Sequence, residues 1–304
     1  MKKQTSKIIK LESIRDIHRT AGIPGPVHPM ITLIDAAELV DMCFNPVSYV
    51  LSFFKITLVT RVSGKFRYGQ GHYDFAEGSL VFAAPHQIVG KIETGTGSEG
   101  ISLFIHPDFL QGSTLAGKIK QFGFFSYASS EALHLSQQER NTIESIFGII
   151  REELNSRIDD FSQEVIIAQI ELLLSYSKRF YKRQFLTRQS VNIDLLQQME
   201  AILETYFDDD LTLAQGVPTV QYLAEHLNYT PNYLSDMLRS LTGLNAQQHI
   251  HNHIIERSKE LLSTTKFTIN EVAYKLGFDY PQSFSRLFKT KTTLSPAQFR
   301  SKFN

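Results

Sequence analysis

Hydrophobic residues change their spacing about halfway along the chain. Before residue 136 they gather in short runs of aromatic and β-branched side chains, separated by glycine, proline and asparagine. Such runs are typical of short strands, and their close spacing favours a small sandwich or barrel. The predicted strands are 49–60, 65–69, 72–76, 79–84 and 101–105, and the Gly- and Thr-rich segment 91–100 is predicted to be an exposed loop.

From Ser136 onward the apolar residues recur every three to four positions, which predicts helices. Ser136 and Glu139 have the spacing of a capping box at the start of the first helix. A second helix is predicted to be capped by Asp160 or Ser162, and the short connection implies an antiparallel pair. The apolar stripes of these two helices either mediate dimerisation or pack against the strands; their predicted bounds are 136–156 and 162–186.

The C-terminal part of the chain contains an internal repeat. Each copy predicts two short helices joined by a tight turn, at Asn228 in the first copy and at Gly277 in the second. This is the helix-turn-helix pattern, whose second helix can enter a DNA major groove. A stacked helical repeat would need at least three units, so a protein-interaction adaptor is the weaker alternative. The segments 224–229 and 231–235 align with 273–278 and 281–285, and the predicted motifs are about 219–241 and 268–291.

The formal charges cancel, with 31 basic and 31 acidic residues, but they are unevenly distributed. Residues 211–304 carry ten Lys or Arg and six Asp or Glu, a net +4, so residues 1–210 carry −4. After Asp279 no acid follows, whereas five bases do. Neutrality therefore excludes a uniformly basic nucleic-acid binder and allows a local one.

Composition places the chain among globular proteins. Hydrophobic residues make up 42% of it, enough for substantial cores. Its single cysteine, Cys43, excludes an internal disulfide framework and favours a reducing compartment. Neither a secretory signal nor an apolar run of membrane-spanning length is recognisable, so we expect a cytoplasmic protein.

Residues 217–304 resemble the DNA-binding domain of AraC-type (AraC/XylS family) bacterial transcription regulators. The resemblance is carried by 217–224 and 228–235 in the first copy and by 272–278, 283–289 and 294–300 in the second. It extends more loosely over the β-rich part, over 106–108 and over the helices before Arg188.

The resemblance implies an α+β chain of two domains. Residues 1–187 would form a cupin-like β-barrel with sensory and dimerisation roles, its helical part at about 136–186. Residues 188–304 would form an all-α domain with two helix-turn-helix motifs. Such a protein is a sequence-specific regulator of transcription rather than an enzyme. It binds double-stranded promoter or operator DNA as a homodimer without a cofactor, responds to a small-molecule effector, and can engage RNA polymerase.

The outward faces of the two recognition helices are the predicted sites of base readout. Arg pairs with guanine and Gln with adenine through two hydrogen bonds each. A connecting helix over 245–262, about 25 Å long, would separate the two recognition helices. The implied readout residues are Gln282, Ser283 and Arg286 in the second copy and Asn232, Tyr233 and Asp236 in the first; the implied phosphate contacts are Arg239, Lys289, Lys291 and Arg300, with Lys302 beside them.

Two positions depart from the family pattern. Asp236 stands where the family commonly has a basic or an amide side chain. It therefore either accepts a hydrogen bond from cytosine or pairs with Arg239. We therefore expect the second copy to bind DNA more strongly than the first. Thr293 stands where the first copy has Gly243. Because a β-branched residue is unfavourable in a left-handed cap, we expect that turn to be rearranged.

Polar residues of the predicted strands are the candidate effector site. Lys55, Arg61, Tyr68 and His72, with Arg67 beside them, would suit an anionic or polyhydroxylated ligand; the alternative is that they are solvated at the strand edges. No metal site is predicted, because His72, His86 and His106 lack the spacing of a cupin metal motif. A cupin-like enzyme with an accessory helical domain is the alternative function, and no catalytic motif supports it.

Overall fold

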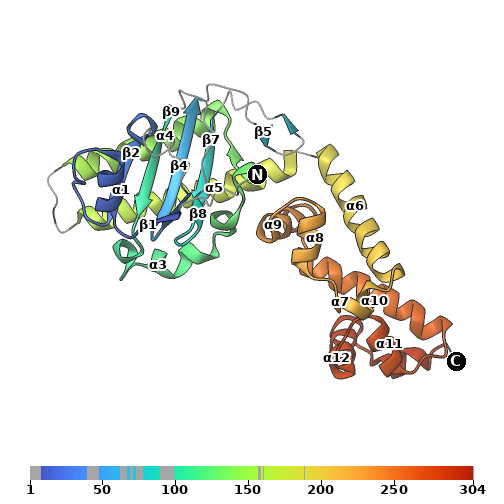
Figure 1. Cartoon of the computed structure of the whole chain (residues 1–304). Helices are drawn as coiled ribbons and strands as arrows, with labels where there is room; N and C mark the ends of the chain where they lie inside the picture. The colour runs from blue at the N-terminus through green and yellow to red at the C-terminus, as the bar shows by residue number, and fades with distance from the viewer. Residues whose placement is uncertain are drawn as a thin grey trace, which may run out of the picture. The chain divides into compact units, whose positions relative to one another are not determined.

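The chain folds into two compact units, Met1–Gln184 and Phe185–Asn304. Figure 1 shows the computed structural model of both. The division lies at 184/185, near the boundary expected at 187/188, and helix α5 runs across it. The structure describes residues 8–39, 48–61, 67–68, 71–72, 78–89, 99–156, 159, 161–187 and 189–303; side chains are not described for residues 48, 61, 67–68, 71–72, 88–89, 129 and 189–193.

The N-terminal unit is built on a five-stranded antiparallel sheet with β4 at its centre. Its edge strands do not pair with each other, so the described residues form no closed barrel, and the predicted cupin-like barrel is not confirmed. The strand order is β10 (Leu133–His134), β7 (Ser79–Ala83), β4 (Phe54–Arg61), β9 (Glu99–Ile105) and β2 (Ile31–Asp35). A second sheet joins β1 (Ile8–Leu11), β3 (Ser48–Leu51) and β8 (Ile88–Val89), and a third joins β5 (Arg67–Tyr68) and β6 (Gly71–His72).

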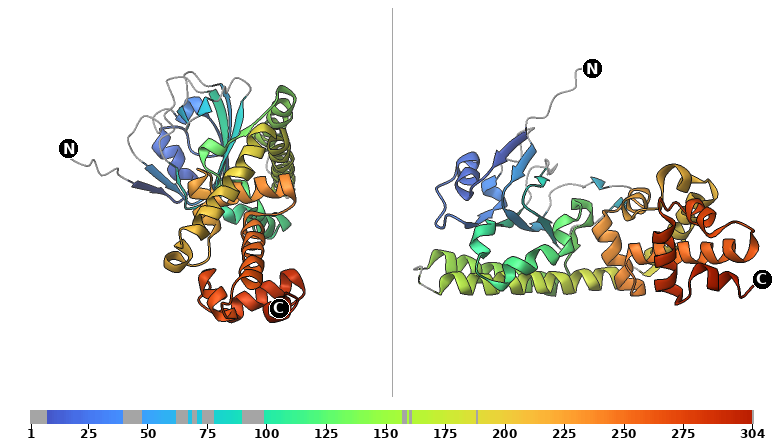
Figure 2. Two further views of the ribbon diagram at one scale, coloured as in Figure 1. Left: turned by 90° about the vertical axis from the view of Figure 1, so that its right-hand side faces the viewer. Right: turned by 90° about the horizontal axis from the view of Figure 1, so that it is seen from below.

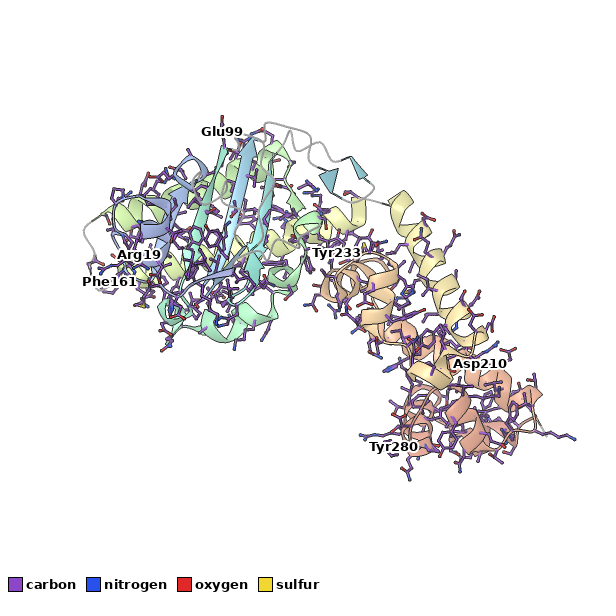
Figure 3. The ribbon with its side chains drawn as sticks, viewed as in Figure 1. Arg19, Glu99, Phe161, Asp210, Tyr233 and Tyr280 are labelled. Carbon is purple, nitrogen blue, oxygen red and sulfur yellow. The ribbon has the colours of Figure 1, made fainter. Side chains whose placement is uncertain are left out.

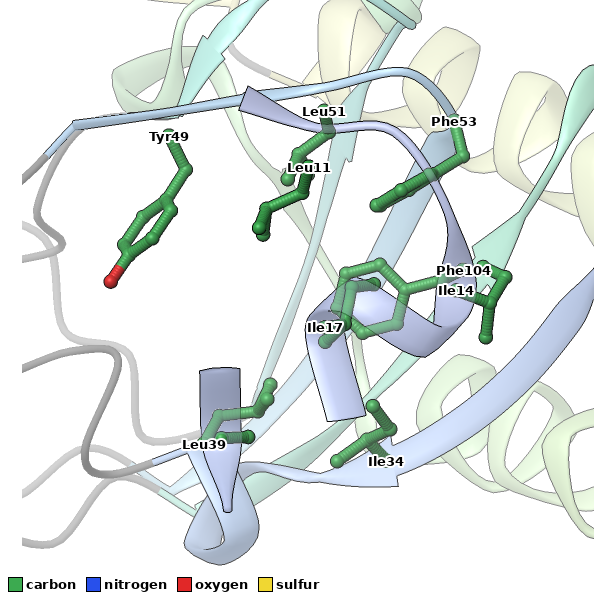
Figure 4. Packing of buried hydrophobic residues seen from close by; sticks show 10 residues of the cluster. Leu11, Ile14, Ile17, Ile34, Leu39, Tyr49, Leu51, Phe53 and Phe104 are labelled. Atoms are coloured by element: carbon green, nitrogen blue, oxygen red, sulfur yellow. The ribbon is translucent and has the colours of Figure 1, made fainter. Parts of the chain in front are cut away.

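Each face of the five-stranded sheet packs against another layer, and one face also carries the buried hydroxyls of Thr57 and Ser102. On one face Phe82 contacts Tyr181 of α5 (Ser162–Thr187), while Arg140 of α4 (Gln137–Asn155) donates a hydrogen bond to the Thr60 carbonyl. On the other face Phe104 joins a buried cluster that includes residues of α1 (Ile14–Ala21), shown in Figure 4. The sheet therefore lies between a layer of helices and a layer formed by α1, β1 and β3, as Figure 2 shows.

Short elements complete this unit, and polar side chains fix the starts of its long helices. The capping box predicted at Ser136 is confirmed, since the Glu139 carboxylate accepts a hydrogen bond from the Ser136 amide at 2.9 Å. At the start of α5 the Asp159 carboxylate accepts hydrogen bonds from the amides of Phe161 and Ser162, and the Ser162 hydroxyl accepts one from the Asp159 amide; Asp160, the other predicted cap, lies outside the described residues. The short elements are η1 (Ala36–Leu39), η2 (Pro107–Leu110), α3 (Thr114–Lys118), η3 (Ile119–Gln121), η4 (Gly123–Ser126) and η5 (Ser129–Glu131).

The C-terminal unit is entirely helical in its described residues. Leucine and phenylalanine side chains at helical spacing, such as Leu234, Leu238, Phe284 and Phe288, form its buried core. The helices are α6 (Gln189–Asp208), α7 (Leu211–Gln215), α8 (Val220–His226), α9 (Pro231–Thr242), α10 (Ala246–Thr264), α11 (Ile269–Lys275), α12 (Pro281–Thr292) and α13 (Pro296–Arg300).

Candidate nucleic-acid interface

The two predicted helix-turn-helix motifs are present, and the first helix of each ends in the same left-handed cap. After α8 the chain passes through Asn228 in the left-handed region (φ 58°), and the Tyr229 amide donates to the Ala224 carbonyl at 2.9 Å. After α11 it passes through Gly277 (φ 86°), and Phe278 donates to the Ala273 carbonyl at 3.0 Å. The same left-handed cap therefore ends α8 and α11, although the connection to the second helix is 227–230 in the first motif and the longer 276–280 in the second.

The exposed face of α12 displays the polar residues expected to read bases. Gln282, Ser283 and Arg286 are all exposed, while Phe284 and Phe288 are fully buried on the other side of the helix. Among the described residues, no hydrogen bond or ion pair holds the Arg286 guanidinium. An exposed guanidinium and an exposed amide in the first turns of a recognition helix can reach base edges in the major groove.

The corresponding face of α9 differs from the prediction. Tyr233, labelled in Figure 3, is only 3% exposed, with its ring edge against Phe185 at 5.1 Å and stacked on Tyr229 at 5.3 Å, so it is a buried residue. Arg239 donates to the Asp236 carboxylate at 2.7 Å, which is the alternative that the sequence left open for this acid. Of the three residues predicted to read bases from α9, only Asn232 is exposed.

The predicted phosphate contacts fall into two groups. Lys289 and Lys291 are exposed on α12, and the Lys291 ammonium donates to the Asn252 side chain at 3.1 Å. Arg300 is instead turned inward: its Nε donates to the Leu262 carbonyl at 3.3 Å and its Nη2 is buried. This side chain thus satisfies a carbonyl in the last turn of α10 and fastens α13 to it, while its phosphate contact stays a prediction.

A close approach of two glycines, which the sequence did not reveal, supports the second motif. A Cβ atom on Gly277 would lie 2.5 Å from the carbonyl carbon of Gly216 and 2.7 Å from the Val217 nitrogen. Around this contact, the Tyr206 hydroxyl donates to the Gly216 carbonyl at 3.0 Å, and the Thr212 hydroxyl donates to the Lys275 carbonyl at 2.8 Å. The segment before α8 thus holds the turn between α11 and α12.

The connection between the motifs is the single helix α10, as predicted. A capping box of Asn245 and Gln248 begins it, and its 19 residues span roughly 28 Å. Its histidines lie against neighbouring side chains, and burial lowers the pKa of His249, His251 and His253 below the usual value of 6.5. The His253 ring stacks on Phe207 of α6 at 5.4 Å.

Comparison with known proteins identifies this helical unit. Residues 223–302 match a family described as a helix-turn-helix domain. The chain is also similar to the arabinose operon regulatory protein of Escherichia coli (strain K12), with 33% identity over 121 residues, which cover 35% of this chain and 41% of that protein. The C-terminal unit contains an AraC-type helix-turn-helix domain.

Other similar proteins match either most of the chain or less than half of it. The HTH-type transcriptional regulator YfiF of Bacillus subtilis (strain 168) is 23% identical over 269 residues, which cover 85% of this chain and 80% of that protein. The solved C-terminal domain of AraT, a response regulator from Geobacillus stearothermophilus, is 29% identical over 36% of this chain and 84% of that one, with a TM-score of 0.32. HTH-type regulators of Staphylococcus aureus match at 29% identity over 139 residues, and this match spans 45% of the chain and 17% of their length.

The turn that closes α12 of the AraC-type domain is not rearranged, contrary to expectation. Thr293 takes the left-handed conformation itself (φ 65°), and its amide donates to the Lys289 carbonyl at 2.9 Å. Gly243, its counterpart after α9, has φ 80° and donates to the Arg239 carbonyl at 3.0 Å. The Thr292 hydroxyl bonds to the carbonyl and the amide of Leu294, as the Thr242 hydroxyl does with Leu244. The same local hydrogen bonds thus accompany both caps, although threonine disfavours the left-handed conformation.

The candidate effector residues of the N-terminal unit are described only in part. Lys55 lies on β4 with its ammonium 5.7 Å from the centre of the Phe104 ring. The side chains of Arg61, Tyr68 and His72 lie outside the described residues, as does Arg67. Within the part of the chain that is described, no three histidine, cysteine or acidic side chains are grouped to hold a metal ion, and no helix is long and apolar enough to cross a membrane.

Two of the hollows among the described residues of this unit are not lined by Lys55. A cleft of about 480 Å³ lies between α4 and the ends of β4 and β9, with Leu58, Ile101 and Phe147 among its apolar lining residues. A smaller one of about 310 Å³ lies beside β2 and includes His18 and His28. The ion pair of Arg151 with Asp35, 2.6 Å apart, lines both hollows.

Proposed function

We propose that this protein is a sequence-specific DNA-binding regulator of transcription that inserts α9 and α12 into successive major grooves. The exposed row Gln282, Ser283 and Arg286 on α12 carries this proposal, because it presents hydrogen-bonding groups from a helix fixed by a buried core. The name of the similar Escherichia coli protein, an operon regulator, supports the same function.

The two recognition helices contribute unequally in this proposal. On α9 the Tyr233 ring is buried and the charges of Asp236 and Arg239 neutralise each other, so Asn232 is the main group left to contact bases. On α12 three polar residues and the exposed cation Lys289 face outward. Sequence discrimination should therefore be strongest in the half-site that α12 contacts.

The experiment uses a duplex selected from random fragments by the purified protein. Arg286→Ala should lose about 1–3 kcal/mol of discrimination at one base position, and the fold should be unchanged because the side chain is exposed. Lys289→Ala is the matched control, since losing a phosphate contact weakens binding to all sequences alike. Binding of Arg286→Ala that equals wild type on every base variant would show that Arg286 does not read a base.

We further propose that the protein is a homodimer formed through α5. Phe161, Val165 and Leu172 are exposed by 69%, 39% and 43%, and their spacing of four and seven residues places them along one seam of the helix. These residues are distinct from the stripe of α5 that packs on the sheet, so the helix carries an apolar face for the core and a second for a copy of itself.

The dimer is tested by replacing the centre of this seam. Val165→Glu with Leu172→Glu should convert a dimer to a monomer in sedimentation equilibrium while the circular dichroism spectrum stays unchanged. The control Ser145→Glu adds a charge at an exposed position on α4, away from this seam. A wild-type protein that is monomeric at all concentrations, with and without its DNA, would refute the dimer.

An effector site in the N-terminal unit completes the proposal. The sheet face that bears Lys55 also carries Thr57 and Ser102, whose buried hydroxyls hydrogen-bond at 2.9 Å. Hydroxyl and ammonium groups on an otherwise apolar face suit an anionic or polyhydroxylated ligand. A screen of such compounds should find one that raises the melting temperature of wild type but not of Lys55→Met.

A further inference from the structure

The last turns of α5 carry a cluster of cations that the fold does not use. Lys178, Arg179 and Lys182 are all exposed, and they lie within two turns of one helix. The sequence has no acidic residue anywhere between Leu172 and Ile193. We call these three residues the α5 cation cluster.

Arg183, next to the cluster, is a cation of this helix that has a structural role. Its guanidinium donates to the Glu139 carboxylate at 2.6 Å and to the His134 carbonyl at 2.7 Å, so it joins α5 to the start of α4. For the α5 cation cluster, by contrast, the described residues provide no hydrogen bond or ion pair.

The helix dipole does not account for the cluster either. Cations stabilise a helix mainly within its last turn, because the interaction weakens rapidly with distance from the free carbonyls. Helix α5 ends at Thr187 and has no basic residue in its last turn. The cluster therefore has no structural role that would explain three unpaired charges in succession.

The C-terminal unit has no net positive charge of its own with which to attract DNA. Residues 211–304 alone are basic, but the unit begins at Phe185 and includes the acids of α6 and of 208–210. Over 185–304 the sequence has eleven Lys or Arg and twelve Asp or Glu, a net charge of −1. Affinity for duplex DNA comes largely from cations that neutralise phosphates. The unit that carries the recognition helices thus lacks an excess of such cations.

We propose that the α5 cation cluster binds phosphates of the duplex flanking the sequence that α9 and α12 contact. This inference rests on the proposed function. Lys182 precedes Phe185, the first residue of the C-terminal unit, by three positions, so the cluster is covalently held close to any DNA that this unit binds. Its contacts are independent of base sequence, since ammonium and guanidinium groups meet only the backbone there.

The test measures how DNA affinity depends on salt. The triple variant Lys178→Gln, Arg179→Gln, Lys182→Gln keeps helix-favouring side chains and removes three charges. The control Lys10→Gln, Arg15→Gln, Lys120→Gln removes three exposed charges elsewhere on the N-terminal unit. The full-length proteins are titrated with a selected site in a duplex of about 40 base pairs and in one trimmed to about 20, two helical turns. Wild type, triple variant and control are compared between 50 and 200 mM NaCl.

On the long duplex, the slope of log affinity against log salt should fall by about 2.7 in the triple variant, at about 0.9 for each phosphate contact. Wild type should then lose roughly 40-fold more affinity than the variant over this salt range. The control and the trimmed duplex should show little change. An unchanged slope on the long duplex, or an equal loss on both duplexes, would overturn the flanking contact. If the triple variant keeps the wild-type salt slope but no longer regulates transcription in cells, the cluster would bind an acidic protein instead, and the flanking contact would again be overturned. No DNA binding by wild type would refute the proposed function itself.

Discussion

Thr293→Gly is expected to stabilise the C-terminal unit. Thr293 holds a left-handed conformation with φ 65°, which brings the Cβ of an L-residue too close to its own backbone. The residue is exposed, and its backbone hydrogen bond to Lys289 would remain in the variant. The substitution therefore removes conformational strain without removing packing.

The magnitude follows from two opposing effects. Relief of the left-handed conformation is worth about 1–2 kcal/mol. Glycine gives the unfolded chain more freedom, which offsets about 0.4–1 kcal/mol of that relief. The Thr293 hydroxyl also donates to the Thr292 carbonyl, a local bond that the variant loses. The expected net stabilisation of the unit is about 0.5–1 kcal/mol, or roughly 2–5 °C in melting temperature for a unit of this size.

Calorimetry of the full chain measures this shift in the transition of the C-terminal unit. Gly243→Ala is the reciprocal variant, because a Cβ there meets nothing within 4 Å and φ is 80°. It should destabilise the unit by about the amount that Thr293→Gly stabilises it. If Thr293→Gly lowers the melting temperature or leaves it unchanged while Gly243→Ala lowers it, then Thr293 is not strained and the argument fails.

Three further predictions concern the same unit. Gly277→Ala should destabilise it by about 2–5 kcal/mol in urea unfolding, well beyond Gly243→Ala, because its Cβ meets the backbone of Gly216 in addition to the left-handed strain; equal effects would refute the close approach. Asp236→Asn should release Arg239, strengthen binding to duplexes of any sequence and steepen the salt dependence by about 0.9, whereas an unchanged slope would show that Arg239 does not reach phosphate. Burial lowers the pKa of His253, so the folded state binds protons less readily than the unfolded state and stability should be lost as the pH falls below 6.5; urea midpoints at pH 7.5 and 5.5 should differ less in His253→Gln.

Features set by neighbouring residues in the sequence were predicted well. The capping box at Ser136, the left-handed turns at Asn228 and Gly277 and the helix linking the two motifs all follow from local hydrogen bonding and helical periodicity. The repeat strengthened these predictions, because its two copies indicated the same left-handed turn. The predicted barrel is not confirmed, since alternation identifies strands but not whether the two edge strands of a sheet meet.

The sequence did not indicate contacts between residues that are distant along the chain. Tyr233 occupies a position that is exposed in the second copy, yet its ring is buried against Phe185 as well as Tyr229. Arg300, predicted to contact phosphate, donates to a carbonyl 38 residues away. Thr293 differs from both, since it is exposed and its left-handed turn is accompanied by local hydrogen bonds of Thr292 with Leu294.

These contacts also explain why two copies of one motif should act differently on DNA. Each turn is dictated locally, so the duplicated sequence reproduces it. The outward face of each recognition helix, however, depends on what surrounds it: Phe185 and Tyr229 cover the Tyr233 ring on α9, whereas Ser283 at the matching position of α12 is exposed. A substitution on α12 should therefore alter sequence preference, while the equivalent change at Tyr233 should first destabilise the core. The copy that retains an exposed polar row is the one in which base specificity is expected to reside.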